Sequence, residues 1–200
     1  LYAIPEIHVR DMKITADFNY KNGNGIFSAE LDIIGECDYS VKLTLTDINE
    51  NKVYESDKAN VRATIPSVRP WSAEEPNLYI LTAEIIAGGR IVETAETKVG
   101  FRAFELKNGL MYLNGKRIIF KGVNRHEFNA KTGRAITEED MLWDIKFIKQ
   151  NNMNAVRTSH YPNNSRWYQL CDEYGIYLID ETNLESHGTW QKMGACEPSI

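Results

Sequence analysis

Apolar and polar residues alternate over the first half of the chain, which is the pattern of strands with one face in a core and the other in water. The clearest run is residues 41–46, and residues 12–18 and 27–33 alternate in the same way. A turn sequence rich in glycine and asparagine, residues 22–25, separates two of these runs, as a hairpin requires. Short strands at this spacing predict an immunoglobulin-like β-sandwich over residues 1–104.

The pattern changes after the sandwich. Apolar segments at residues 110–113 and 117–120 flank Asn114-Gly115, a favoured two-residue hairpin turn. We interpret residues 117–120 as the first strand of a second domain. The polar segment that comes next, residues 122–127, is interpreted as the loop after that strand.

Two helices are predicted further along the chain. Thr137 and Asp140 match a capping-box variant, and apolar residues then repeat at i, i+4 and i+7 over residues 138–150. A second helix is expected over residues 165–174, where Gly175 ends it. The side chains that we expect on the buried faces of these helices are Met141, Ile145, Ile148, Trp167, Leu170, Cys171 and Tyr174.

Residues 155–157 and 176–179 are interpreted as strands that alternate with the helices, and the second is apolar throughout, as in a strand buried on both faces. Strands that alternate with helices predict a parallel sheet with right-handed crossovers. A complete (β/α)8 barrel takes about 250 residues. The predicted fold class is therefore multidomain, β then α/β, with the sandwich followed over residues 105–200 by the first three βα units of an incomplete, truncated TIM barrel.

Each of the three predicted parallel strands is followed by a loop that carries a histidine: His126, His160 and His187. A lone histidine is usually incidental, but three of the four histidines in the chain occupy these loops. Loops at the carboxyl ends of parallel strands form the active-site face of α/β enzymes. We therefore expect the three side chains to lie near one mouth.

Charged residues accompany the histidines. Arg157 lies on or just after a buried strand, so its guanidinium needs an anionic partner, either structural or catalytic. Asp180 and Glu181 could be acid/base groups, caps or partners of Arg157, and the sequence leaves these alternatives open. On an extended segment, Glu185 and His187 would point the same way and could form a ligand pair. Their oxygen and nitrogen donors, with no cysteine, would suit Mg²⁺ or Mn²⁺ better than Zn²⁺.

Composition narrows the classes of partner. The formal net charge of −5 disfavours nucleic acid. No apolar run is long enough to span a bilayer and no signal-peptide pattern begins at Leu1, so no membrane partner is expected and the compartment stays unassigned. The absence of an initial Met indicates a fragment. Three scattered cysteines, Cys37, Cys171 and Cys196, are expected to be reduced, buried thiols.

The motifs of the second half resemble those of the glycoside hydrolase family that holds β-galactosidases, β-glucuronidases and β-mannosidases. Residues 154–162, continued through residues 171–176, are similar to the family's first signature, which is long and specific. Shorter similarities precede it at residues 99–102, 113–116 and 121–127. The resemblance covers essentially the whole chain, as the family's sandwich followed by the start of its barrel.

Within the family, residues 124–127 and 180–188 favour the β-galactosidase branch. The resemblance implies a retaining enzyme that hydrolyses terminal non-reducing β-D-galactosides and is a homo-oligomer at full length. It also implies roles for particular residues. Sugar contacts are expected from His126 and His160, orientation of the nucleophilic carboxylate from Arg157, and binding of Mg²⁺ from Glu185 and His187.

The family's acid/base glutamate and its nucleophilic glutamate have no counterpart among these residues, and we expect both to lie beyond Ile200. No catalytic residue is therefore assigned, and the 200-residue chain by itself is predicted to be inactive. The alternatives are a non-catalytic sandwich, acting as a scaffold or carbohydrate-binding module, and a fragment of a β-glucuronidase or β-mannosidase.

Overall fold

The structure is a computed structural model that describes residues 3–184. The chain divides into two compact units, residues 1–119 and residues 120–200. Each unit contains a hydrophobic core of its own.

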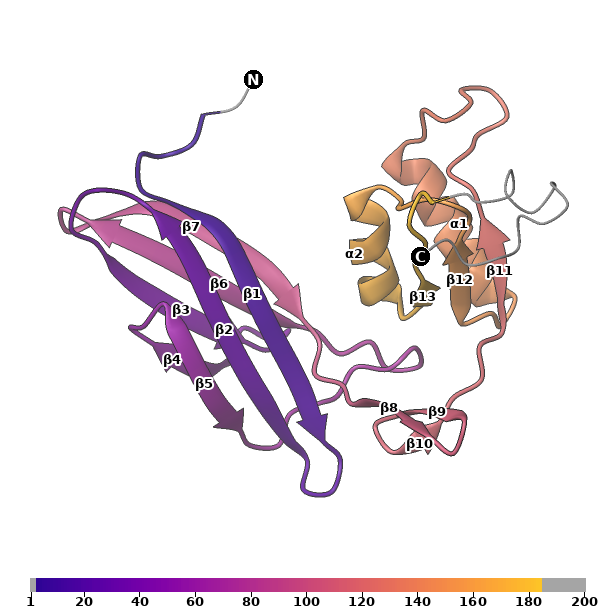
Figure 1. Cartoon of the computed structure of the whole chain (residues 1–200), viewed down its shortest axis with the longest axis horizontal. Coiled ribbons are helices and arrows are strands. Elements are labelled where there is room, and N and C mark those ends of the chain that lie inside the picture. The colour runs from indigo at the N-terminus through magenta and orange to yellow at the C-terminus, as the bar shows by residue number, and fades with distance from the viewer. Residues whose placement is uncertain (1–2, 185–200) are drawn as a thin grey trace, which may run out of the picture. The chain divides into compact units, whose positions relative to one another are not determined.

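The first unit is a sandwich of two antiparallel sheets (Figure 1). One sheet, ordered β1-β2-β5, contains β1 (His8–Asn19), β2 (Asn24–Ile34) and β5 (Asn60–Ile65). The other, ordered β4-β3-β6-β7, contains β3 (Ser40–Thr46), β4 (Lys52–Ser56), β6 (Tyr79–Ala87) and β7 (Arg90–Val99). This arrangement confirms the predicted immunoglobulin-like sandwich.

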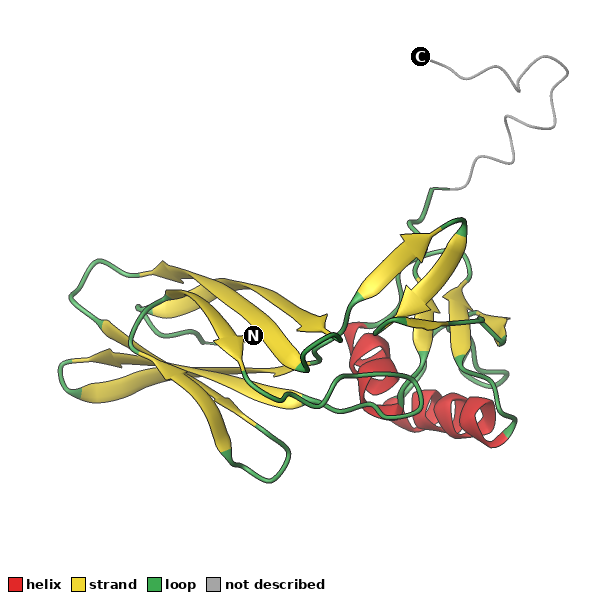
Figure 2. Ribbon diagram, turned by 90° about the horizontal axis from the view of Figure 1, so that it is seen from below, coloured by secondary structure: helices red, strands yellow, loops and turns green. Residues whose placement is uncertain are grey.

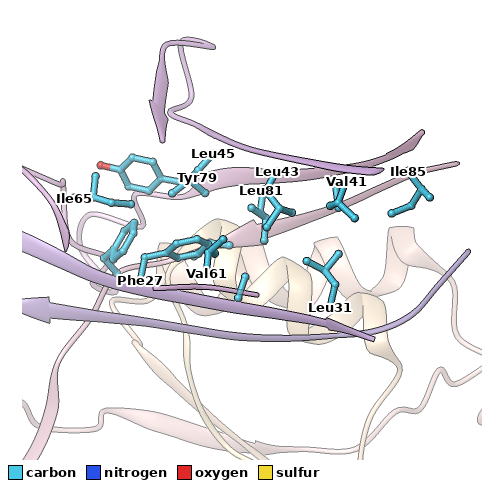
Figure 3. Packing of buried hydrophobic residues seen from close by; sticks show 14 of the residues in the cluster. Phe27, Leu31, Val41, Leu43, Leu45, Val61, Ile65, Tyr79, Leu81 and Ile85 are labelled. Carbon is cyan, nitrogen blue, oxygen red and sulfur yellow. The ribbon is translucent and has the colours of Figure 1, made fainter. Parts of the chain in front are cut away.

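The core of the sandwich lies between the two sheets, where every second residue of a strand points inward (Figure 3). Phe27 and Leu31 of β2 face Leu43 of β3 and Leu81 of β6 across this layer. Leu43 and Leu81 are completely buried, whereas their sequence neighbours are at least partly exposed. The alternation in the sequence therefore corresponds to the two faces of each sheet.

A small antiparallel sheet, ordered β10-β9-β8, ends the first unit. It contains β8 (Phe104–Lys107), β9 (Leu110–Leu113) and β10 (Lys116–Arg117). The predicted hairpin turn is confirmed, because φ is +52° at Asn114 and +78° at Gly115, as a type I′ turn requires. The second arm is shorter than predicted, since only Lys116 and Arg117 pair with β9.

The second unit contains a parallel sheet ordered β11-β12-β13, made of β11 (Gly122–Arg125), β12 (Ala155–Thr158) and β13 (Tyr177–Ile179). The prediction that residues 117–120 form its first strand and residues 122–127 a loop was wrong. β11 pairs with β12 residue by residue, from Gly122 opposite Ala155 to Arg125 opposite Thr158. This strand is formed by backbone pairing, which the sequence does not show. Because two of its four residues, Asn124 and Arg125, are polar, the segment did not have the apolar pattern of a buried strand.

Two helices lie along one side of the parallel sheet (Figure 2). Their bounds, α1 (Glu138–Gln150) and α2 (Ser165–Tyr174), confirm the predicted ranges. Gly175 ends α2 with φ +71°. The helices and the sheet share one core, which contains Met141, Ile145, Ile148, Val156, Trp167, Leu170, Cys171 and Ile176.

Two predictions about burial in this unit were wrong. Tyr174 is 38% exposed, because it lies in the last turn of α2 at the rim of the core. Ile179 is 46% exposed, because β13 is an edge strand of the sheet and is not covered on both faces by the described residues. Within residues 3–184, no helix follows β13, so this part of the chain contains two of the three predicted βα units in full.

The cysteine prediction was wrong in one respect. Cys171 is buried and its thiol is free, as expected, and burial raises its pKa. Cys37 is also free but lies exposed, because it belongs to the irregular segment between β2 and β3. Cys196 lies outside the described residues. None of the helices among residues 3–184 is long and apolar enough to cross a membrane.

The start of α1 gives a testable prediction. The backbone N–H of Thr137 donates to Asp140 at 2.8 Å, and the N–H of Asp140 donates back to the Thr137 hydroxyl at 3.3 Å. Thr137→Ala removes the cap and should lower the free energy of unfolding by about 1 kcal/mol. Urea titrations followed by circular dichroism measure this loss, and Glu139→Gln, which leaves the cap intact, is the control.

The same cap should be sensitive to acid. The hydrogen bonds from Thr137, followed by that from Asn129, lower the pKa of Asp140. A lowered pKa in the folded state stabilises the fold above the ordinary pKa, and this contribution is lost as the pH falls through the folded value. Asp140→Asn should therefore reduce the acid dependence of unfolding. An unchanged acid limb in this variant would contradict the assignment.

Candidate active site

The carboxyl ends of the three parallel strands bring several of the predicted site residues together. His126 follows β11 directly, and Arg157 and His160 lie in β12 and just beyond it. Glu181 lies two residues after β13. The rings of His126 and His160 are 5.6 Å apart and nearly perpendicular. Parallel register places these residues on one edge of the sheet, where α/β enzymes hold their active sites.

Glu181 bridges Arg157 and His160. Its Oε1 accepts a hydrogen bond from Nε of Arg157 at 2.5 Å, and its Oε2 lies 2.8 Å from Nδ1 of His160. The side chain of Arg157 is 37% exposed, because this residue reaches the carboxyl edge of the sheet. Its anionic partner is nevertheless present. Of the alternatives left open for Glu181, the structure has it as the partner of Arg157.

The electrostatics of this group favour an ionised carboxylate. The hydrogen bond with His160, reinforced by Arg157 and opposed by partial burial, lowers the pKa of Glu181. A proton donor in general acid catalysis needs a raised pKa instead. Glu181 is therefore suited to holding Arg157 and His160 in place and is poorly suited to donating a proton.

Asp180 belongs to a separate set of hydrogen bonds. Its Oδ1 accepts from the hydroxyl of Thr158 at 3.0 Å and from that of Tyr168 at 2.7 Å. Burial, followed by the hydrogen bond to Asp180, raises the pKa of Tyr168. Thr158 is completely buried, and its hydroxyl also accepts from the backbone N–H of Glu181 at 3.0 Å. These bonds tie the end of β13 to β12.

The loops after β11 and β12 are also joined by hydrogen bonds. The backbone N–H of Glu127 donates to the hydroxyl of Tyr161 at 3.1 Å, and Oε1 of Glu127 accepts from the N–H of Asn164 at 2.8 Å. The guanidinium of Arg134 lies over the Tyr161 ring, 4.2 Å from its centroid. The mouth of the sheet thus has a wall built from two interlocked loops.

Arg125 is a residue whose importance the sequence reasoning missed. It is only 7% exposed, and its guanidinium lies 3.6 Å from the centre of the Trp167 ring. Its Nε donates to Asp144 of α1 at 2.8 Å, and its Nη1 donates to Asn163 at 2.9 Å. It directly precedes His126, so it anchors the strand end that carries this histidine. The sequence did contain a signal for this role. An arginine that directly precedes a predicted site residue at the end of a strand has little access to water, so it needs partners within the fold.

The expected metal ligands, Glu185 and His187, lie outside the described residues. His187 is also the third of the histidines expected in the loops after the parallel strands. The expected donor set of carboxylate oxygen and imidazole nitrogen is compatible with Mg²⁺. Among residues 3–184, no group of three or more His, Cys, Asp or Glu side chains could hold a metal ion.

Comparison with known protein families matches each half of the chain to a different domain of one family. Residues 7–102 match the family profile "Glycosyl hydrolases family 2", and residues 104–200 match "Glycosyl hydrolases family 2, TIM barrel domain". The compact units divide at residues 119 and 120 instead, so the predicted boundary at residues 104 and 105 stays a prediction. The profiles confirm a β-rich domain followed by the start of a TIM barrel.

Curated relatives cover the whole chain. A β-galactosidase of Streptococcus thermophilus is 55% identical over an alignment of 207 positions, which covers 100% of this chain and 20% of that protein. A β-galactosidase of Clostridium acetobutylicum is 55% identical over an alignment of 206 positions, which covers 100% of this chain and 23% of that protein. The chain thus spans about a fifth of the length of these relatives.

A solved structure is similar as well. The β-glucuronidase of Ruminococcus gnavus in complex with D-glucuronic acid matches with a TM-score of 0.82 and 27% identity. The match covers 89% of this chain and 30% of that one. Profiles, curated relatives and this structure agree with the resemblance found in the sequence motifs. The chain belongs to glycosyl hydrolases family 2.

Proposed function

We propose that this chain supplies part of the active-site wall of a retaining β-galactosidase that removes terminal β-D-galactosyl groups. The observation that carries the proposal is the convergence of His126, Arg157 and His160 at the carboxyl edge of the parallel sheet. The 55% identity to curated β-galactosidases over the whole chain supports galactose as the sugar.

In the proposed reaction, this chain binds and orients while two glutamates elsewhere in the barrel make and break bonds. A retaining glycosidase uses one carboxyl to protonate the leaving oxygen and another, about 5 Å away, to attack the anomeric carbon. His126 and His160 would form hydrogen bonds with the sugar. Arg157 would hold the nucleophilic carboxylate, for which its position at the carboxyl edge of β12 is suitable.

Magnesium is part of the proposal. Glu185 and His187 would hold Mg²⁺, which supplies positive charge close to the acid/base carboxyl. In a full-length enzyme that contains these residues, Glu185→Gln should weaken Mg²⁺ binding measured by calorimetry and should lower activity. Binding as tight as that of the unaltered enzyme would argue against this ligand set.

The activity test uses chromogenic substrates with the full-length enzyme and with the 200-residue chain alone. We expect the full-length enzyme to hydrolyse a 4-nitrophenyl β-D-galactoside and the isolated chain to be inactive. Turnover by the isolated chain that Glu185→Ala abolishes would overturn the second expectation. Association into a homo-oligomer at full length stays a prediction, which light scattering can test.

A second candidate is a β-glucuronidase, favoured by the similarity to the R. gnavus enzyme. The two candidates separate on substrate preference. A kcat/KM larger for 4-nitrophenyl β-D-glucuronide than for the galactoside would replace the proposed function. We expect the opposite preference, because the identity to the β-galactosidases is twice as high.

A further inference from the structure

One carboxylate at the mouth of the sheet contacts two of the proposed site residues at once. Glu181 uses Oε1 for Arg157 and Oε2 for His160, so each of its oxygens has a cationic or donor partner. Its side chain is 25% exposed, which shields these contacts in part from water. The Glu181 backbone is held too, by the bond from its N–H to the Thr158 hydroxyl.

The hydrogen-bonding chemistry of this group selects one tautomer of His160. An ionised carboxylate can only accept hydrogen bonds, so Nδ1 of His160 must carry a proton to bond with Oε2 at 2.8 Å. The guanidinium of Arg157 can only donate, so a bond from its Nη2, 3.3 Å from the same Nδ1, would require that nitrogen to be unprotonated. The contact with Glu181 decides the tautomer, because at 2.8 Å it is the shorter of the two and an unprotonated Nδ1 would face the carboxylate with no hydrogen between them. In the neutral ring, Nε2 is then the acceptor nitrogen.

Glu181 is better suited to this task than its neighbour. Asp180 directs its Oδ1 to two hydroxyl groups, those of Thr158 and Tyr168. These bonds fix the backbone of the strand end without touching either His160 or Arg157. The two adjacent carboxylates therefore have different tasks, one within the fold and one at the site.

We propose that Glu181 is a positioning residue, which selects the Nδ1–H tautomer of His160 and fixes the direction of the Arg157 guanidinium. The inference rests on the proposed function for its catalytic consequence, since His160 and Arg157 are the groups assigned to the sugar and the nucleophile. The contacts themselves can be tested without any activity.

The first test is nitrogen-15 NMR of the histidine rings in the 200-residue chain, recorded in alkaline buffer where imidazoles are neutral. His160→Gln assigns the signal by removing it. The unaltered chain should have the Nδ1–H pattern, and Glu181→Ala should shift most of the population to the Nε2–H tautomer. Glu173→Gln, which alters an ion pair of Arg166 on α2, should leave the pattern unchanged.

Two results would overturn the inference directly. One is an Nε2–H pattern in the unaltered chain, and the other is an unchanged Nδ1–H pattern in Glu181→Ala. Glu181→Gln has a carbonyl oxygen that can accept from a protonated Nδ1 and an amide nitrogen that can donate to an unprotonated one, and it lacks the charge that holds Arg157. If Glu181→Ala fails to fold, this second variant still decides the matter, because it should contain both tautomers in comparable amounts.

The second test is kinetic and uses the full-length enzyme. Glu181→Ala should lower kcat for a galactoside about 100-fold with a change of less than about threefold in KM, because misplaced groups cost more in the transition state than in the ground state. Glu181→Gln should recover part of kcat. An active enzyme whose kcat is insensitive to both changes would refute the inference. An inactive unaltered enzyme with the expected tautomers would refute only the proposed function.

Discussion

Gly122→Ala is expected to separate β11 from β12. A Cβ at Gly122 would collide with the carbonyl oxygen of Ala155 and lie 2.6 Å from its carbonyl carbon, which belong to the backbone of the partner strand. Backbone cannot rotate away as a flexible side chain can. The steric cost, about 3 kcal/mol, exceeds the roughly 0.7 kcal/mol that alanine gains by restricting the unfolded chain.

Hydrogen exchange with mass spectrometry measures this loss locally. Peptides from β11 and β12 should exchange faster in Gly122→Ala, whereas peptides from the sandwich should keep their protection. The matched control is Gly109→Ala, where φ is +74° and no atom lies within 4 Å of the new Cβ. This control should cost only about 1 kcal/mol of backbone strain, confined to the turn between β8 and β9. Equal protection of β11 in the unaltered chain and in Gly122→Ala would contradict the close pairing.

Arg125→Met should destabilise the second unit by about 3 kcal/mol. The change retains much of the side-chain volume but removes the charge, leaving Asp144 and Asn163 without their donor. Loss of one partner of a buried ion pair costs about 3–5 kcal/mol. The lower end applies here, because Asp144 is 33% exposed and water can replace part of the bond. The contact with the Trp167 ring is also lost.

Arg166→Met is the matched control for this substitution. Arg166 pairs with Glu138 and Glu173, but it is 34% exposed, and pairs of this kind contribute less than about 1 kcal/mol. Native-state hydrogen exchange of α1 and β12 gives the free energy of opening for both variants. If the two substitutions have the same effect, burial of the Arg125 guanidinium is not what stabilises the unit. Arg125→Lys should lie between them, since an ammonium group lacks the planar fork.

The helices show how far sequence reasoning reaches in this protein. The cap at Thr137 and the spacing of Met141, Ile145 and Ile148 lie within one short segment, so the bounds of α1 could be predicted in full. β11 could not be found in the same way. Its Val123 and Asn124 are exposed, and its only regularity is backbone pairing with a strand about thirty residues later.

The candidate site also contains features that local sequence patterns predict and features that only contacts between distant segments decide. His126, Arg157 and His160 could be singled out because each follows or ends a strand in the sequence. That Glu181, and not Asp180, contacts both Arg157 and His160 could not be predicted, because adjacent carboxylates at a strand end are equivalent in one dimension. The direction in which the chain leaves β13 distinguishes them.

The sequence by itself determined the two fold classes, the helix bounds, the hairpin turn and the family, since all of these depend on local spacing or on long motifs. Only the tertiary structure decided which strand begins the parallel sheet, how Arg125 is buried and which carboxylate bridges the two site residues. The physical reason is that these features are contacts between distant segments. Their energies depend on distances and burial, which no local pattern of residues specifies.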